Sequence, residues 1–220
     1  SRLGIRENKN NFFMFLELVC NLLKVVLYLY LPLKKGKKIP TDREKRIINI
    51  ILAKGHLLAL IDPRKMFANT MLGFTECFKY DLSRSQVALN GISGGSALFS
   101  FTGLSFSLGK RSLDYVRKNL SARNGNVSLY YYKMFETIHN YLTGNWDDDL
   151  GEDFIDYNIK IGEIYCAATH LLYIGYIYLY RGEFDFTKIL IEKLHLISEQ
   201  FNTDHAAVMY YTLKGLLLKR

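Results

Sequence analysis

The fold that we predict from the sequence rests on the stretch LLYIGYIYLYRGEFDFTKILIEKLHLISE, residues 171–199. Apolar residues recur at helical spacing on both sides of the turn Arg181-Gly-Glu-Phe184. We expect Gly182 to end the first helix in the left-handed conformation that glycine adopts without strain. We also expect the small Gly175 to let the second helix approach closely, with Tyr178 and Phe184 packing between the two helices. The stretch therefore predicts an antiparallel helical hairpin.

The same pattern recurs twice upstream, at Phe106–Arg111 and at Asn140–Trp146, where Gly109 and Gly144 follow an aromatic-rich segment. Gly109, Gly144 and Gly182 are spaced by 35 and 38 residues, near the 34-residue period of tetratricopeptide hairpins. We therefore predict a helical repeat. The residues that define it are Gly109, Gly144, Trp146, Gly175, Tyr178, Gly182 and Phe184.

The rest of the chain also reads as helices. Proline occurs only at positions 32, 40 and 63, each in a gap between helical patterns, and no segment alternates like a strand. The predicted fold is all-α: a right-handed, tetratricopeptide-like solenoid of stacked antiparallel hairpins. We expect ten helices, near 8–31, 42–60, 64–79, 84–107, 110–121, 127–143, 147–159, 162–181, 184–201 and 204–218.

In its order of features, the stretch 43–220 resembles the divergent tetratricopeptide region of large multidomain signalling ATPases. In these proteins the region is joined to adenylate/guanylate cyclase, kinase or transcription-factor modules. The turns Gly144-Asn-Trp146 and Arg181-Gly-Glu-Phe184 are the more specific features. The resemblance implies a regulatory repeat segment and a longer parent chain. The nucleotide-binding loop of that family has no counterpart here, because the stretch Gly91–Gly95 lacks the Gly-Lys-Ser/Thr ending.

The net charge of +8 lies entirely in the first quarter of the chain. Residues 1–55 hold 12 Lys and Arg against 4 Asp and Glu, whereas residues 56–220 hold 17 of each. We therefore predict two parts: 1–41, an apolar helix with a basic loop, and 42–220, one continuous repeat array. The basic residues predicted to meet a partner are Lys34, Lys35, Lys37 and Lys38. Aromatic side chains do not alternate with these lysines, so nucleic acid is not an expected partner.

The apolar run Phe12–Leu33 is long enough to span a membrane. Glu17, Asn21 and Lys24 interrupt it at helical spacing and would form one polar stripe. We expect a helix packed against its neighbours with this stripe facing water. The alternative hypothesis is a membrane-associated helical module that docks through this helix and the basic loop 34–46.

Three features suggest chemistry, and each has a simpler structural explanation. Gly91-Ile-Ser93-Gly-Gly95 matches the G-x-S-x-G motif, but no strand precedes it, so we predict close helix packing there. Cys166 and His170 lie one helical turn apart without the other ligands that zinc requires. The acidic residues of 147–156 suit the start of a helix. We therefore expect no enzyme activity, no metal and no cofactor.

Function is expected to lie in contact with other proteins. Three unpaired cysteines in 220 residues fit a reducing compartment, so a cytoplasmic location is expected. Helical repeat arrays bind peptides on extended surfaces, and Tyr130, Tyr173 and Tyr176 are predicted to line such a surface. The prediction is a scaffold or sensor segment in signal transduction that binds a protein, a peptide or neighbouring domains of its own chain.

Overall fold

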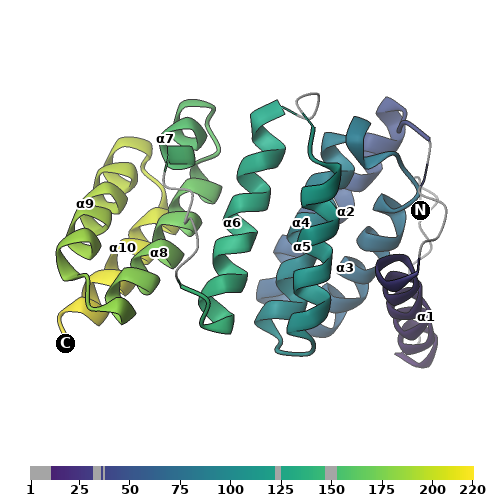
Figure 1. Cartoon of the computed structure of the whole chain (residues 1–220), viewed down its shortest axis with the longest axis horizontal. Coiled ribbons are helices and arrows are strands. Elements are labelled where there is room, and N and C mark those ends of the chain that lie inside the picture. The colour runs from purple at the N-terminus through teal and green to yellow at the C-terminus, as the bar shows by residue number, and fades with distance from the viewer. Residues whose placement is uncertain (1–10, 32–35, 37, 122–124, 147–152) are drawn as a thin grey trace. The chain divides into compact units, whose positions relative to one another are not determined.

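The computed structural model describes residues 11–31, 36, 38–121, 125–146 and 153–220 (Figure 1). These residues form ten α-helices and one short 3-10 helix and contain no strand, which confirms the all-α prediction. The helices are α1 (Asn11–Tyr30), α2 (Asp42–Ile61), α3 (Pro63–Cys77), η1 (Leu82–Arg84), α4 (Gln86–Phe101), α5 (Phe106–Asn119), α6 (Gly125–Thr143), α7 (Asp153–Lys160), α8 (Ile164–Arg181), α9 (Phe184–Phe201) and α10 (Asp204–Leu217).

The contacts between helices divide the chain into two compact units, Ser1–Tyr132 and Lys133–Arg220. The division falls inside α6. Helix α1 packs on α3 and α5 and so belongs to the first unit. The predicted boundary at residue 41 separates α1 from helices that it contacts, and the division into parts 1–41 and 42–220 stays a prediction.

Side-chain caps explain why four helices of the first unit begin where they do. The hydroxyl of Thr41 accepts from the backbone N–H of Glu44, and the Glu44 carboxylate accepts from the Thr41 N–H at 2.8 Å, which completes a capping box at α2. Helices α3, α4 and α5 begin with the first of these two bonds alone: the side chain of Asp62, Ser85 or Ser105 accepts a backbone N–H of the first turn. Each cap satisfies a donor that the first turn of a helix otherwise leaves unpaired.

The first unit is held together where glycines of α4 let α3 approach. A Cβ at Gly91 would lie 2.5 Å from the Cys77 sulfur, and a Cβ at Gly95 would overlap the ring of Phe74. No side chain larger than hydrogen fits at Gly95 without displacing that ring. The close helix packing predicted for this stretch is therefore confirmed.

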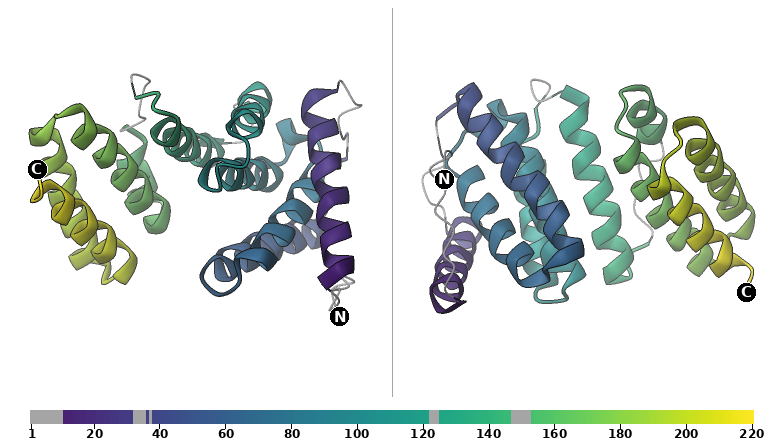
Figure 2. Two further views of the ribbon diagram at one scale, coloured as in Figure 1. Left: turned by 90° about the horizontal axis from the view of Figure 1, so that it is seen from below. Right: turned by 180° about the vertical axis from the view of Figure 1, so that it is seen from behind.

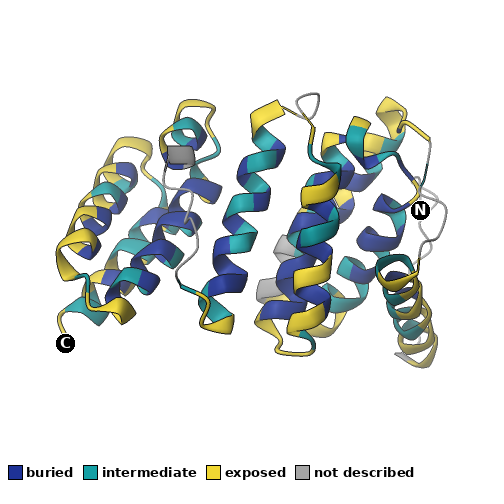
Figure 3. Cartoon of the chain, in the orientation of Figure 1, coloured by how far each residue is buried: buried dark blue, intermediate teal, exposed yellow. Residues whose placement is uncertain are grey.

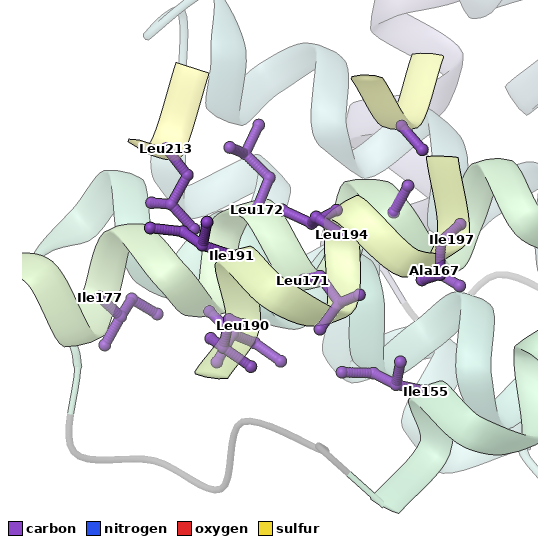
Figure 4. Packing of buried hydrophobic residues seen from close by; sticks show 13 residues of the cluster. Ile155, Ala167, Leu171, Leu172, Ile177, Leu190, Ile191, Leu194, Ile197 and Leu213 are labelled. Atoms are coloured by element: carbon purple, nitrogen blue, oxygen red, sulfur yellow. The ribbon is translucent and has the colours of Figure 1, made fainter. Parts of the chain in front are cut away.

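In the second unit, α8 and α9 form a hairpin, and α10 packs against both (Figure 2). The core between them is a cluster of buried apolar side chains contributed by α7, α8, α9 and α10 (Figure 4). Its members are Ile155, Ala167, Ala168, Leu171, Leu172, Ile174, Ile177, Leu190, Ile191, Leu194, Ile197, Ala206 and Leu213. Burial of these side chains is the main force that holds the helices of this unit together.

Gly175 makes the close approach that was predicted, but with a different helix. A Cβ at Gly175 would overlap the side chain of Leu213, which belongs to α10. The prediction assigned this role to α9, the second helix of the same hairpin. The two-residue turn leaves α9 beside the other buried residues of α8, so the glycine faces α10 instead.

Three turns of the second unit share one geometry. Gly144, Gly162 and Gly182 take φ values of 75°, 83° and 79°. At each turn the glycine N–H donates to the carbonyl three residues back, and the next N–H donates to the carbonyl five residues back. This pair of bonds is the Schellman motif, which satisfies carbonyls at a helix end. The predictions for Gly144 and Gly182 are confirmed.

The prediction for Gly109 is wrong. Gly109 is buried inside α5, and the turn before that helix contains Gly103, whose φ is 64°. Ser105 starts α5 by accepting the N–H of Leu108, so the helix begins before Gly109 is reached. Hydroxyl capping therefore sets this boundary, and the helices predicted as 84–107 and 110–121 meet about five residues earlier than expected.

The aromatic contact predicted across the Gly182 turn also shifts. Phe184 begins α9 and is 41% exposed. The ring that stacks on Tyr178 is that of Phe186, at 5.3 Å between centroids. Residues two positions apart in a helix point to nearly opposite sides, so Phe186 faces Tyr178 and Phe184 does not.

The predicted packing of α1 is wrong in part. About half of its apolar side chains are exposed and only Val25 is buried, and Figure 3 shows α1 coloured mainly as exposed and intermediate. Asn21, predicted to face water, is buried, while Glu17 and Lys24 are exposed among apolar neighbours. The reason is that α3 and α5 cover one side of α1 and leave its other side to solvent.

Candidate functional site

One side of α8 carries a row of aromatic and hydroxyl side chains. Tyr165, Thr169, Tyr173, Tyr176 and Tyr180 follow one another at intervals of three or four residues. This spacing places them on one side of a helix. We call the surface formed by the four tyrosines of this row, together with Tyr141, Trp146 and His205, the tyrosine face.

The neighbouring α6 and the turn after it extend the tyrosine face on one flank. The ring of Tyr141 lies 5.5 Å from Tyr173, 5.1 Å from Tyr176 and 6.1 Å from Tyr180 between centroids. Trp146 lies 5.6 Å from Tyr180 and donates its indole N–H to the Tyr141 carbonyl at 3.2 Å. Each of these ring distances is in the range of favourable aromatic pairs.

Helix α10 bounds the tyrosine face on the other flank. His205 stacks on Tyr165 at 4.0 Å between ring centroids and shares a hydrogen bond of 3.0 Å with the Thr169 hydroxyl. At the far end of the helix, the Arg220 guanidinium lies 5.3 Å from the centre of the Tyr180 ring. The face thus combines rings from α6, α8, α10 and the turn after α6, with a cation beside Tyr180 at one end.

The rings of the tyrosine face are half-buried, so water does not fully solvate their hydroxyls. Burial raises the pKa of Tyr141 to about 12, with the adjacent Tyr180 adding to the effect. Burial likewise raises the pKa of Tyr165, Tyr173 and Tyr176. These hydroxyls are therefore neutral near pH 7 and can donate or accept hydrogen bonds.

The structure brings two of the three predicted tyrosines together. Tyr173 and Tyr176 are neighbours, 5.6 Å between ring centroids. Tyr130 is 5% exposed, so its ring is not available to a partner on the surface. Tyr141, Tyr165, Tyr180 and His205 were not predicted; the three-and-four spacing of tyrosines along 165–180 is the signal that identifies the row on α8.

Of the predicted basic residues, Lys34, Lys35 and Lys37 lie outside the described residues. Lys38 forms an ion pair with Glu44. Hydrogen bonds from Lys38 and Thr41 lower the pKa of the Glu44 carboxyl to about 2. The charge of Lys38 is therefore already matched within the first unit.

A pocket of about 340 Å³ lies beside this ion pair. Lys79 and Glu76, which also line the pocket, form a second ion pair at 2.5 Å. Opposite charges are paired within the pocket, so it offers an ionic ligand little net attraction. Its lining is Lys38, Glu44, Ile47, Ile48, Glu76, Lys79 and Tyr80.

The residues considered for catalysis take structural positions. Ser93 is fully buried within α4 and donates its hydroxyl to the Leu89 carbonyl at 3.0 Å, which is a bond internal to the helix. Cys166 and His170 are both buried, and His170 Nε2 shares a hydrogen bond of 3.0 Å with the Thr137 hydroxyl. Within the described residues no three His, Cys, Asp or Glu side chains gather as metal ligands.

The acidic run at 147–152 lies outside the described residues. Helix α7 as described begins at Asp153. Asp156 forms an ion pair of 3.5 Å with Lys193 of α9. This carboxylate therefore links α7 to α9.

No family model, curated protein or solved structure matches this chain.

Proposed function

We propose that the chain is a non-catalytic helical-repeat scaffold that binds a protein or peptide partner across the tyrosine face. The observation that carries the proposal is the alignment of α6, α8 and α10. Thr137 contacts His170 and, one turn later in both helices, Tyr141 contacts Tyr173, so α6 and α8 run in the same direction. The same holds for α8 and α10, because Tyr165 pairs with His205 at one end and Tyr180 with Arg220 at the other.

The sequence separation of these contacts supports a repeat. Hydrogen bonds join Thr137 to His170, Trp146 to Arg181 and Thr169 to His205 across 33, 35 and 36 residues. The link between Asp156 of α7 and Lys193 of α9 spans 37 residues. Near-constant separations are expected when each hairpin stacks on the next, as in tetratricopeptide arrays. We therefore extend the proposal to a tetratricopeptide-like solenoid whose first helices line one side.

The chemistry of the tyrosine face suits a peptide partner. Aromatic side chains bury large areas at low entropic cost, and tyrosine is enriched among residues that dominate binding energy. Neutral hydroxyls between the rings can bond to a peptide backbone. Binding that relies on aromatic contact depends weakly on salt.

The proposed context is a multidomain cytoplasmic signalling protein. The turns Gly144–Trp146 and Arg181–Phe184 resemble those of the repeat region in signalling ATPases, and this supports a regulatory role. In that context the partner could also be a neighbouring domain of the same chain. Occupancy of the tyrosine face would then be passed to an attached output domain.

A peptide-display selection tests the proposal. Phage-displayed peptides selected on the immobilised chain are remeasured with Tyr173→Ala/Tyr176→Ala and with Tyr211→Ala, a 69% exposed tyrosine outside the tyrosine face. We expect the double variant to lose about tenfold or more in affinity and the control to match the unmodified chain. Peptides that bind both variants equally, or a selection that enriches none, would refute a peptide-binding role for this face.

A further inference from the structure

Helix α1 presents an apolar surface to solvent along its whole length. Six large apolar side chains on this side of the helix are 42% to 63% exposed. The helix is long and apolar enough to cross a membrane, with a mean hydropathy of 2.0 over Phe12–Tyr30, and only 11% of that segment is buried. A core helix of a soluble protein can be as long and as apolar as this, but it is mostly buried, and this segment of α1 is not. The residues concerned are Phe12, Phe13, Phe15, Leu16, Leu23 and Leu27.

The opposite side of α1 is fixed to the first unit. Val25 is fully buried, and the Tyr28 ring stacks on Phe78 at 4.8 Å. The Arg111 guanidinium lies 3.9 Å from the centre of the Tyr30 ring, and the Tyr30 hydroxyl shares a hydrogen bond of 3.3 Å with Ser107. These contacts hold the helix with its exposed apolar side directed away from the unit.

The charges around α1 indicate what covers this side. In the sequence, Arg2, Arg6 and Lys9 precede the helix against one acidic residue, and Lys34, Lys35 and Lys37 follow it, in addition to Lys38, whose charge Glu44 matches. Within the helix the charged residues are Glu17 and Lys24. An apolar helix bordered by cations complements an anionic lipid surface, because each nearby Lys or Arg is attracted to the negatively charged head groups.

We propose that α1 docks the chain on an anionic lipid bilayer, lying in the plane of the interface with its exposed apolar side among the lipids. The helix lies on the membrane and does not span it, because spanning would break the contacts of Val25 and Tyr28 with the first unit. Lys24 can extend its ammonium to the head groups while its stem stays apolar. This surface is separate from the tyrosine face, so either proposal can fail without the other.

Cys20 provides a probe at the right place. It lies one helical turn from Leu16 on the exposed side of α1, whereas Cys77 and Cys166 are buried. The full chain is labelled at Cys20 with an environment-sensitive fluorophore and mixed with vesicles of phosphatidylcholine, with or without phosphatidylserine. We expect a blue shift and increased emission that are stronger with phosphatidylserine. Quenching by spin-labelled lipids should place the probe near the head groups.

A matched pair of variants separates specific docking from general stickiness. Leu16→Gln/Leu23→Gln removes two exposed apolar side chains from α1, and Leu196→Gln/Val208→Gln removes two comparably exposed ones from the second unit. Because all four residues are exposed, both variants should keep the circular dichroism of the unmodified chain. We expect co-flotation with the anionic vesicles to fall about tenfold for the first variant. The second variant should float as the unmodified chain does.

Three results would overturn the proposal. The first is that neither the labelled nor the unlabelled chain binds vesicles. The second is quenching that places Cys20 at the bilayer centre, which would mean a spanning helix. The third is a dimer in light scattering that the α1 variant converts to a monomer without any lipid effect, since a second copy of the chain would then cover the face.

Discussion

Replacing Gly95 by alanine in α4 tests the closest contact in the first unit. The added methyl group would overlap the ring of Phe74, with the ring's Cζ atom 2.9 Å away. Phe74 is 1% exposed, and its ring lies 5.9 Å from those of both Phe78 and Phe99. The ring has no space to rotate into, so α3 and α4 must separate instead.

The magnitude follows from two opposing terms. Alanine stabilises a helix interior relative to glycine by about 1 kcal/mol. Overpacking a core costs about 1–3 kcal/mol, and the confined Phe74 ring favours the upper part of that range. We expect Gly95→Ala to lower the free energy of unfolding by about 1–2 kcal/mol.

The matched control is Gly55→Ala in α2. The nearest atom to a Cβ there is the Asn69 amide nitrogen at 3.4 Å, which is ordinary van der Waals contact. Without a clash, this substitution should stabilise the unit by about 0.5–1 kcal/mol.

Urea unfolding and thermal unfolding, both followed by circular dichroism, measure the two variants. In the thermal scan, each kcal/mol of unfolding free energy should move the melting temperature by about 2–4 °C. A double variant, Gly95→Ala/Phe74→Leu, adds an internal check. Once the ring is gone, the alanine should cost little, and the two substitutions should show a strong coupling energy. If Gly95→Ala stabilises the chain as much as Gly55→Ala does, the close approach of α3 and α4 is refuted.

In the second unit, Gly175→Ala should have a free energy of unfolding about 1–3 kcal/mol below that of Gly215→Ala. Leu213 fills the space beside position 175, whereas position 215 is open. Equal unfolding curves for the two variants would contradict this. Burial lowers the pKa of His205, so the unfolded state binds a proton more readily. The stability that neutral His205 provides should be complete above about pH 6.5 and fall as the pH drops towards the folded pKa, and His205→Gln should flatten this part of the urea-midpoint profile. Thiol titration should count one reactive cysteine, Cys20, in the native chain and three after denaturation. Two rapidly reacting thiols in the native chain would mean that a cysteine described as buried is accessible to the reagent.

Helix content was predictable because the signals are local. Thr41, Gly144 and Gly182 act through hydrogen bonds to residues at most five positions away, so their neighbours in the sequence determine what they do. Gly109 was misassigned because a glycine in a repeat-like context looks the same whether it ends a helix or lies inside one. The deciding residue, Ser105, carries the capping hydroxyl.

Contacts between helices were harder to predict. Gly175 signalled a close approach, but only the packing of α8 on α10 shows that Leu213 is the neighbour. In the same way, the sequence shows a row of tyrosines on α8, whereas the position of Tyr141 beside Tyr173 depends on how α6 stacks. The exposure of α1 had no local signal, because an apolar helix has the same sequence pattern whether protein or lipid covers it.

The anchoring of α1 has a consequence for biosynthesis. The hydrogen bond from Tyr30 to Ser107 spans 77 residues, whereas the interhelical hydrogen bonds described for the second unit span 33 to 37. Hairpins of the second unit can thus form soon after they leave the ribosome. Helix α1 must wait for α5 to be translated before Tyr30 finds its partners. Until α3 has emerged to pack on it, every side of this apolar helix is open to chaperones and to the membrane-targeting machinery of the cell.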